Sequence, residues 1–110
     1  MPALKDKLLK MWNEEDTKER CGFILKNNVV LEVENTHPQP EFGFEICAKD
    51  IVENEDKLKG TWHTHPNSNA ILSHEDYTCF LNWPKLEHYI LGQNGIRRYV
   101  VKDGVLQNDS

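Results

Sequence analysis

The chain has 110 residues, which suits one small domain and is too short for an eight-stranded β/α barrel of about 250 residues. Its 18 acidic residues outnumber 13 Lys and Arg, and the net charge of −5 argues against nucleic acid and anionic membranes as partners. No apolar run approaches the ~18 residues of a membrane span, and the sequence carries no secretion signal and no disulfide framework. We therefore expect a single domain over residues 1–110, located in the cytoplasm.

The apolar pattern predicts an α/β domain in which helices and strands alternate along the chain. Helices are expected over residues 3–14, 48–58 and 73–83, the last of them stopped by Pro84. Strands are expected over residues 21–25, 29–33, 42–46, 60–64, 88–91 and 96–101. Loops are expected over residues 35–41 and 67–72, turns at Asn27-Asn28, Asn94-Gly95 and Asp103-Gly104, and a short tail after the last turn.

A candidate metal site lies in the stretch His63-Thr64-His65-Pro66 together with Asp76. Side chains at positions i and i+2 of a strand point to the same face, so His63 and His65 can aim both imidazoles at one point. Asp76 follows 11 residues after His65, and a loop of that length can return its carboxylate to the same point from the first turn of the next helix. Two histidines and one carboxylate are a common ligand set of catalytic zinc. Trp62 falls on the opposite face and is expected in the core.

Two further groups would complete a hydrolytic site. Ser73 opens a Ser-x-x-Asp pattern and is expected to cap the helix, which would fix Asp76, and its hydroxyl could also donate to a developing oxyanion. A general base is also needed, and spacing alone does not select it. The available carboxylates are Glu14, Glu15, Asp16, Glu19 and Glu75.

The motif His63-Thr64-His65-Pro66, six intervening residues, then Ser73 and Asp76, resembles the JAMM motif of the MPN (JAB1/MPN/Mov34) metallopeptidases, written HxHP and SxxD. Glu19-Arg20-Cys21-Gly22 stands where that family has an upstream Glu-x-x-Gly. The resemblance extends over residues 4–101. It implies a single MPN (JAB)-like domain with a mixed central β-sheet flanked by helices.

The resemblance also implies a function. One Zn²⁺ per chain would be bound by His63, His65 and Asp76, Glu19 would act as the general base and later protonate the leaving amine, and Ser73 would stabilise the oxyanion. The family hydrolyses peptide or isopeptide bonds. Short segments around 35–45 and 77–90 resemble the compact prokaryotic and bacteriophage members. The expected partner is a protein or peptide substrate, such as a ubiquitin-like C-terminal tail or, in a phage-infected host cytoplasm, a phage tail component, with the substrate strand paired to an exposed sheet edge.

Two other classes remain open. A non-enzymatic MPN scaffold for protein assembly is the alternative, although such members usually lack some ligands and this chain lacks none. A cysteine peptidase built on Cys21 is the third hypothesis, weakened because a cysteine entering an apolar strand is usually a small buried hydrophobe. Cys47 and Cys79 are expected as core or neutral surface residues. Among the remaining histidines, His74 is expected in solvent, and no role is assigned to His37 and His88.

Overall fold

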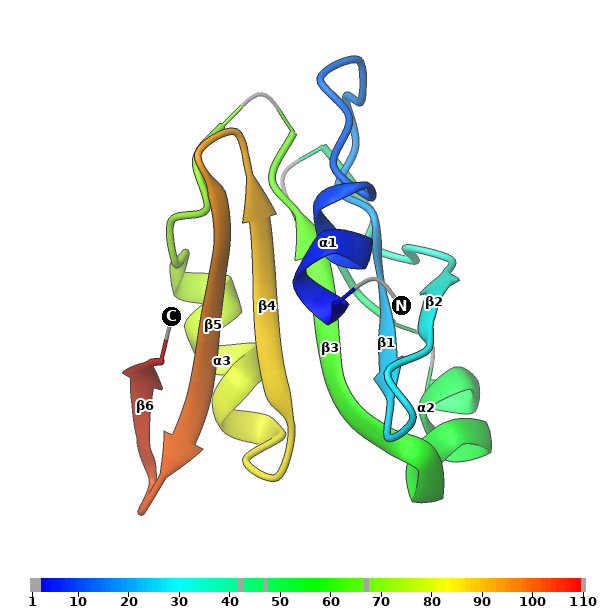
Figure 1. The fold of residues 1–110 in the computed structure, drawn as a ribbon, viewed down its shortest axis with the longest axis vertical. Coiled ribbons are helices and arrows are strands. Elements are labelled where there is room, and N and C mark those ends of the chain that lie inside the picture. The colour runs from blue at the N-terminus through cyan, green and yellow to red at the C-terminus, as the bar shows by residue number, and fades with distance from the viewer. Residues whose placement is uncertain (1–2, 42, 47, 67, 110) are drawn as a thin grey trace.

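The computed structural model describes residues 3–41, 43–46, 48–66 and 68–109, which form one six-stranded sheet with helices on both faces (Figure 1). The helices are α1 (Leu4–Leu9), α2 (Ala48–Asn54) and α3 (His74–Asn82), and a 3₁₀ turn η1 (Glu55–Lys57) follows α2. The strands are β1 (Cys21–Leu25), β2 (Val30–Val33), β3 (Leu58–Thr64), β4 (Glu87–Gly92), β5 (Gly95–Lys102) and β6 (Val105–Asn108).

The strand order is β2-β1-β3-β4-β5-β6, and the sheet is mixed. β3 and β4 are parallel, because α3 carries the chain back across one face between them, whereas all other neighbours are antiparallel. This arrangement confirms the predicted α/β fold with a mixed central sheet flanked by helices. In this order, β2 and β6 form the edges of the sheet, and β3 lies in its interior.

The two faces of the sheet are covered by different helices. On one face, α1 contributes Leu8 to a buried cluster with Ile24, Trp62, Tyr89 and Leu91. The other face packs against α3 through a second cluster, which contains Ala70, Phe80, Ile90 and Tyr99. Alternation along β3 therefore directs Trp62 into the first core, as the sequence predicted, and directs His63 towards α3.

The first predicted helix is too long, because α1 ends at Leu9 rather than near residue 14. Beyond its end the backbone is held by contacts with distant parts of the chain. The Met11 carbonyl accepts a hydrogen bond from Arg20 Nη1 at 2.7 Å, and the Trp12 indole donates to the His65 carbonyl at 3.1 Å. These tertiary bonds replace the helical ones that the periodicity of Leu4, Leu8, Met11 and Trp12 suggested.

The predicted strand over residues 42–46 is wrong for the part that the structure describes. Phe42 lies outside the described residues, and Ile46 forms only an isolated bridge with Asn35. The Asn35 side chain accepts the backbone N–H of Glu45 at 3.0 Å, which takes up a group that a strand neighbour would otherwise bind. Phe44 and Ile46 instead line a cavity of the domain.

Two further boundaries differ from the prediction. The helix expected over residues 48–58 ends at Asn54 and tightens into η1, after which Leu58 already begins β3. The tail expected after the Asp103-Gly104 turn is the strand β6. Asp103 and Gly104 have φ values of 53° and 77°, and this tight turn pairs β5 with β6. None of the helices in the described part of the chain combines the length and apolar character that a membrane span requires.

Candidate metal centre

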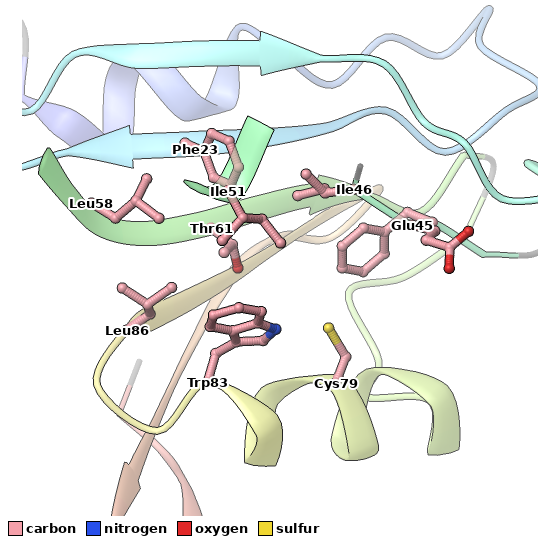
Figure 2. Close-up of a pocket in the computed structure, with 10 residues that line it drawn as sticks. Phe23, Glu45, Ile46, Ile51, Leu58, Thr61, Cys79, Trp83 and Leu86 are labelled. Carbon is pink, nitrogen blue, oxygen red and sulfur yellow. The ribbon is translucent and has the colours of Figure 1, made fainter. Parts of the chain in front are cut away.

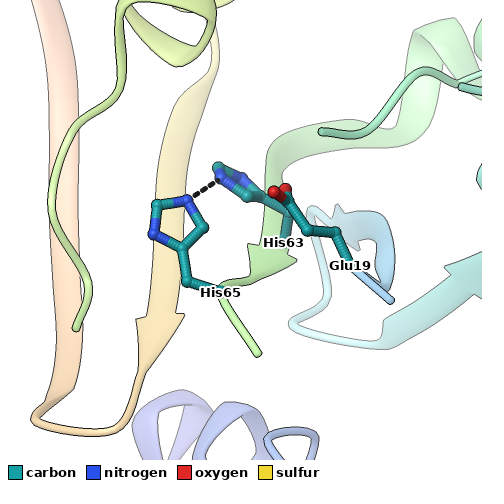
Figure 3. Close-up of side chains that lie close together, drawn as sticks. All are labelled: Glu19, His63 and His65. Carbon is teal, nitrogen blue, oxygen red and sulfur yellow. Dashed lines mark hydrogen bonds between the residues drawn. The ribbon is translucent and has the colours of Figure 1, made fainter. Parts of the chain in front are cut away.

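The two histidines of the HxHP motif meet at the end of β3. His63 lies in β3 between β1 and β4, and His65 follows just after the strand. Their Nε2 atoms lie 3.1 Å apart, and the exposed fractions are 0% for His63 and 9% for His65 (Figure 3). The structure therefore brings both imidazoles to one buried point, as their i, i+2 spacing predicted.

Asp76 reaches the same point from the first turn of α3. Its Oδ1 lies 3.1 Å from His63 Nε2, and its Oδ2 lies 3.1 Å from His65 Nε2. A capping box holds the carboxylate in place: Ser73 Oγ accepts a hydrogen bond from the Asp76 N–H, and Asp76 Oδ2 accepts one from the Ser73 N–H. The predicted cap at Ser73 is therefore present.

Glu19 joins the cluster because the pairing of β1 with β3 continues beyond Cys21. Cys21 lies opposite His63, and reciprocal bonds between Arg20 and Thr64 extend this register, so Glu19 comes opposite His65. One ligand atom each from Glu19, His63 and His65 lie within 4.8 Å of one another (Figure 3). Glu19 is 8% exposed, and its Oε1 is buried without a hydrogen-bond partner in the part of the chain that the structure describes.

The other candidate carboxylates are engaged elsewhere. Asp16 forms an ion pair with Arg20, and Glu75 lies 2.9 Å from His37 Nε2. Glu14 and Glu15 are exposed in the loop after α1. Of these five carboxylates, Glu19 is the one found among the described residues in a group with His63 and His65 that could hold a metal ion.

Burial and charge set the protonation of the cluster without a metal. Desolvation raises the pKa of Glu19 to about 7, partly opposed by His65. Burial alone would raise the pKa of Asp76, but His63 and His65 hold it well below its usual range. Burial lowers the pKa of His63, whereas His65, although also desolvated, has a raised pKa because Asp76 favours its charged form.

The residues present fit a zinc ion. Two ligand atoms on a tetrahedral zinc at about 2.0–2.1 Å lie roughly 3.3–3.4 Å apart, close to the 3.1 Å separations among His63 Nε2, His65 Nε2 and the Asp76 oxygens. Two neutral imidazoles and one carboxylate are also the donor types that zinc prefers. Glu19 Oε1, which has no hydrogen-bond partner among the described residues, lies beside the two imidazoles. Its lone pair can accept a hydrogen bond from a further ligand of the metal, such as water.

Two residues that the sequence did not single out orient His65. Its Nδ1 lies 3.1 Å from the Asn69 carbonyl, and this contact makes Nδ1 the protonated nitrogen and leaves the Nε2 lone pair for a metal. Its backbone carbonyl accepts the hydrogen bond from the Trp12 indole. The helical spacing of Trp12 concealed this role, since it placed the residue in an amphipathic helix.

The remaining sequence candidates are found in other settings. Cys21 is buried in β1, and burial raises the pKa of its thiol to about 12, so the thiolate that a cysteine peptidase needs is disfavoured. Cys79 is half-buried, and Cys47 lies outside the described residues. His74 is exposed, as expected. His88, to which no role was assigned, is fully buried between Thr61 Oγ1 at 2.7 Å and the Trp83 carbonyl at 3.0 Å.

Comparisons with known proteins agree with this architecture. The sequence profile of Prok-JAB, described as prokaryotic homologues of the JAB domain, matches residues 1–102. The solution structure of protein DSY2949 from Desulfitobacterium hafniense is similar to this chain with a TM-score of 0.65 and 20% sequence identity, over 96% of this chain and 84% of that one. A comparison with curated proteins gives no significant match. The profile spans almost the whole chain, and the protein therefore belongs to the family of prokaryotic JAB-domain homologues.

Proposed function

We propose that the protein is a zinc-dependent metallopeptidase that hydrolyses peptide or isopeptide bonds, with one zinc ion per chain bound by His63, His65 and Asp76. The observation that carries the proposal is the convergence of these three side chains at 3.1 Å separations, with Glu19 Oε1 beside them, buried and without a hydrogen-bond partner among the described residues. When bound by these residues, zinc would supply Lewis acidity, which would polarise the scissile carbonyl and make a hydrolytic water more acidic.

Glu19 is the proposed general base. Its Oε1 takes a proton from the attacking water and later delivers that proton to the nitrogen of the leaving amine. In the metal-free chain, desolvation raises the pKa of Glu19 to about 7, which shows that this carboxyl lies in surroundings that favour proton uptake.

Ser73 is the proposed oxyanion donor. The Ser73 oxygen accepts the N–H of Asp76, which leaves its own O–H proton free to donate towards the reacting carbonyl. The side chain is exposed at the start of α3, where a substrate can reach it.

The proposed substrate is a protein or peptide, such as a ubiquitin-like C-terminal tail or a phage tail component. His63 is in an interior strand with β1 and β4 on either side, so a substrate strand beside the metal would not pair directly with β3. An extended substrate would instead run along the segment 43–46, where the Phe44 ring stacks on the His63 imidazole at 4.2 Å.

The test combines metal content with cleavage. We expect one zinc per chain in the wild type and in His74→Ala, an exposed control, but none in His63→Ala, whose fold is checked by circular dichroism. Cleavage of a peptide library, read by mass spectrometry, should stop with a chelator and fall by about 10²- to 10⁴-fold in Glu19→Gln. Normal cleavage by Glu19→Gln would show that the base assignment is wrong. Bound zinc without cleavage of any peptide would instead favour the non-enzymatic scaffold.

A further inference from the structure

Figure 2 shows a cavity of about 220 Å³ beside β3. It lies on the same face of the sheet as the metal centre, because Thr61 in its lining and His63 are two residues apart in β3. Thr61 and Phe23 line its floor and lie opposite each other in β3 and β1. Ile51 of α2 forms one wall, and Cys79 and Trp83 from α3 and its C-terminal end form the other. The cavity is therefore bounded by four separate elements of the fold.

Phe44 connects this cavity to the metal centre. Its side chain lines the cavity and also stacks on the imidazole of His63, with ring centroids 4.2 Å apart and planes inclined by 21°. Thr61 precedes His63 by two residues on the same face of β3, a distance of about 7 Å along the strand. A substrate in extended conformation has the same rise per residue, so a side chain two or three residues from the cleaved bond comes level with the cavity.

The chemistry of the lining selects for an uncharged apolar side chain. The walls are mainly aliphatic and aromatic, the Thr61 hydroxyl is already bonded to His88 at 2.7 Å, and burial raises the pKa of the Cys79 thiol to about 11, so that it stays neutral. The acidic residue of the lining, Glu45, is exposed to solvent. An unpaired charge placed here would lose its hydration without compensation. Trp83 remains 38% exposed, which leaves the cavity open to solvent on that side.

The size of the cavity suits one large side chain. A cavity of about 150 Å³ accommodates a benzene ring, whereas small-molecule sites usually measure about 300–1,000 Å³. At about 220 Å³, this cavity is larger than the one that holds benzene and smaller than a usual small-molecule site, and its size corresponds to a side chain such as leucine or phenylalanine.

We propose that this cavity is a specificity subsite that binds one bulky apolar side chain of the peptide substrate, two or three residues from the cleaved bond. The inference rests on the proposed peptidase function, because that function supplies the reason for a peptide to lie beside His63. It goes beyond that function by naming a feature of the substrate and the residues that select it.

The experiment measures binding separately from cleavage. The probes are six-residue glycine/serine peptides that carry a single leucine at each position in turn, together with the same peptide without leucine. They are titrated into the zinc-loaded Glu19→Gln chain, which preserves the peptides, and the indole N–H signal of Trp83 is followed by NMR. Ile51→Trp fills the cavity, and Ile71→Trp is the matched control because Ile71 is 66% exposed and lies outside the cavity lining.

We expect at least one leucine peptide to shift the Trp83 signal and to bind about 10-fold more tightly than the leucine-free peptide, a ratio that corresponds to about 1.4 kcal/mol. Ile51→Trp should abolish this preference, and Ile71→Trp should keep it, with zinc content unchanged in both. Equal binding of all peptides, or a preference that survives Ile51→Trp, would overturn the subsite. Absence of zinc from the wild type would contradict the proposed function itself, whatever the titration gives, so the two failures are distinguishable.

Discussion

The side-chain amide of Asn35 donates a hydrogen bond to the backbone carbonyl of Glu19 at 2.8 Å, and so ties the candidate base to a loop on the other side of the β1–β2 hairpin. The same amide donates to the Gly43 carbonyl, and its oxygen accepts the N–H groups of His37 and Glu45. One side chain therefore fixes the backbone of Glu19 and of the segment that carries Phe44, which makes Asn35 a positioning residue.

Replacing Asn35 by Asp tests this role, because the substitution keeps both acceptor contacts and removes both donors. We expect hydrolysis to fall at least about 10-fold, since the Glu19 carbonyl would face a carboxylate oxygen in place of an N–H. Zinc content should stay at one per chain, because the side-chain hydrogen bonds of Asn35 go to Glu19, Gly43, His37 and Glu45 and not to the three proposed ligands. Asn27→Asp is the matched control, since within the described part of the chain the Asn27 side chain acts as an acceptor alone, towards the Val29 N–H. Equal losses in both variants would refute a specific role for Asn35.

Removing the metal should lower thermal stability. Zinc binds a set of groups that converge only in the folded chain, and a free concentration 100 times the dissociation constant stabilises that state by about 2.7 kcal/mol. For a domain of this size, we expect Tm to rise by about 10 °C on adding zinc to the chelator-treated protein, measured by calorimetry. His65→Ala should show almost no response. A wild-type Tm insensitive to zinc would contradict the site.

Gly22, the glycine of the Glu19-Arg20-Cys21-Gly22 stretch, is required by close packing in the sheet. A Cβ at this position would lie 1.8 Å from the Leu31 carbonyl oxygen and 2.7 Å from Trp62 Nε1. Those two atoms are joined by a hydrogen bond of 3.0 Å, so the methyl group of Gly22→Ala would force them apart. We expect a loss of about 3 kcal/mol in the free energy of unfolding, measured with urea. A loss below about 1 kcal/mol would show that the sheet can shift enough to accommodate the methyl group.

His88 should make the fold sensitive to acid. Burial lowers the pKa of His88 to about 4, against about 6.5 in the unfolded chain, so the folded state binds fewer protons between these values. The contribution of this residue is fully present above pH 6.5 and is lost as the pH falls towards 4, by about 3 kcal/mol in total. Urea titrations between pH 7 and 4 should show this slope in the wild type and a weaker slope in His88→Gln. Parallel slopes would exclude His88 as the source.

The sequence predicted those parts of the site that depend on local spacing. His63 and His65 converge because two residues of a strand share a face, and Ser73 caps α3 because its pattern with Asp76 forms a capping box. Glu19 could not be selected from the residues alone, since its place depends on the register between β1 and β3, a long-range property. Only the resemblance to the MPN family pointed to it.

The errors have a similar physical origin. Trp12 and Asn35 use their side chains to bind backbone groups far away in the chain, and both thereby override the local pattern that predicted a longer helix and an additional strand. β6 was missed because its few residues, Val105–Asn108, carry little apolar signal and gain their order from pairing with β5. In each case, the local structure depends on a bonding partner elsewhere in the chain, which the hydrophobic periodicity of a short segment cannot reveal.

The interior position of β3 divides the proposed ligands into two dynamic classes. The amide of His63 is enclosed by β1 and β4 and should exchange with deuterium only when the whole domain unfolds, whereas Asp76 sits in the first turn of α3, which can fray alone. A metal ion would therefore enter and leave by opening of that turn, while the His63 imidazole stays fixed. The exchange rate of the metal is then governed by the hydrogen bonds of one helix end and not by the stability of the sheet.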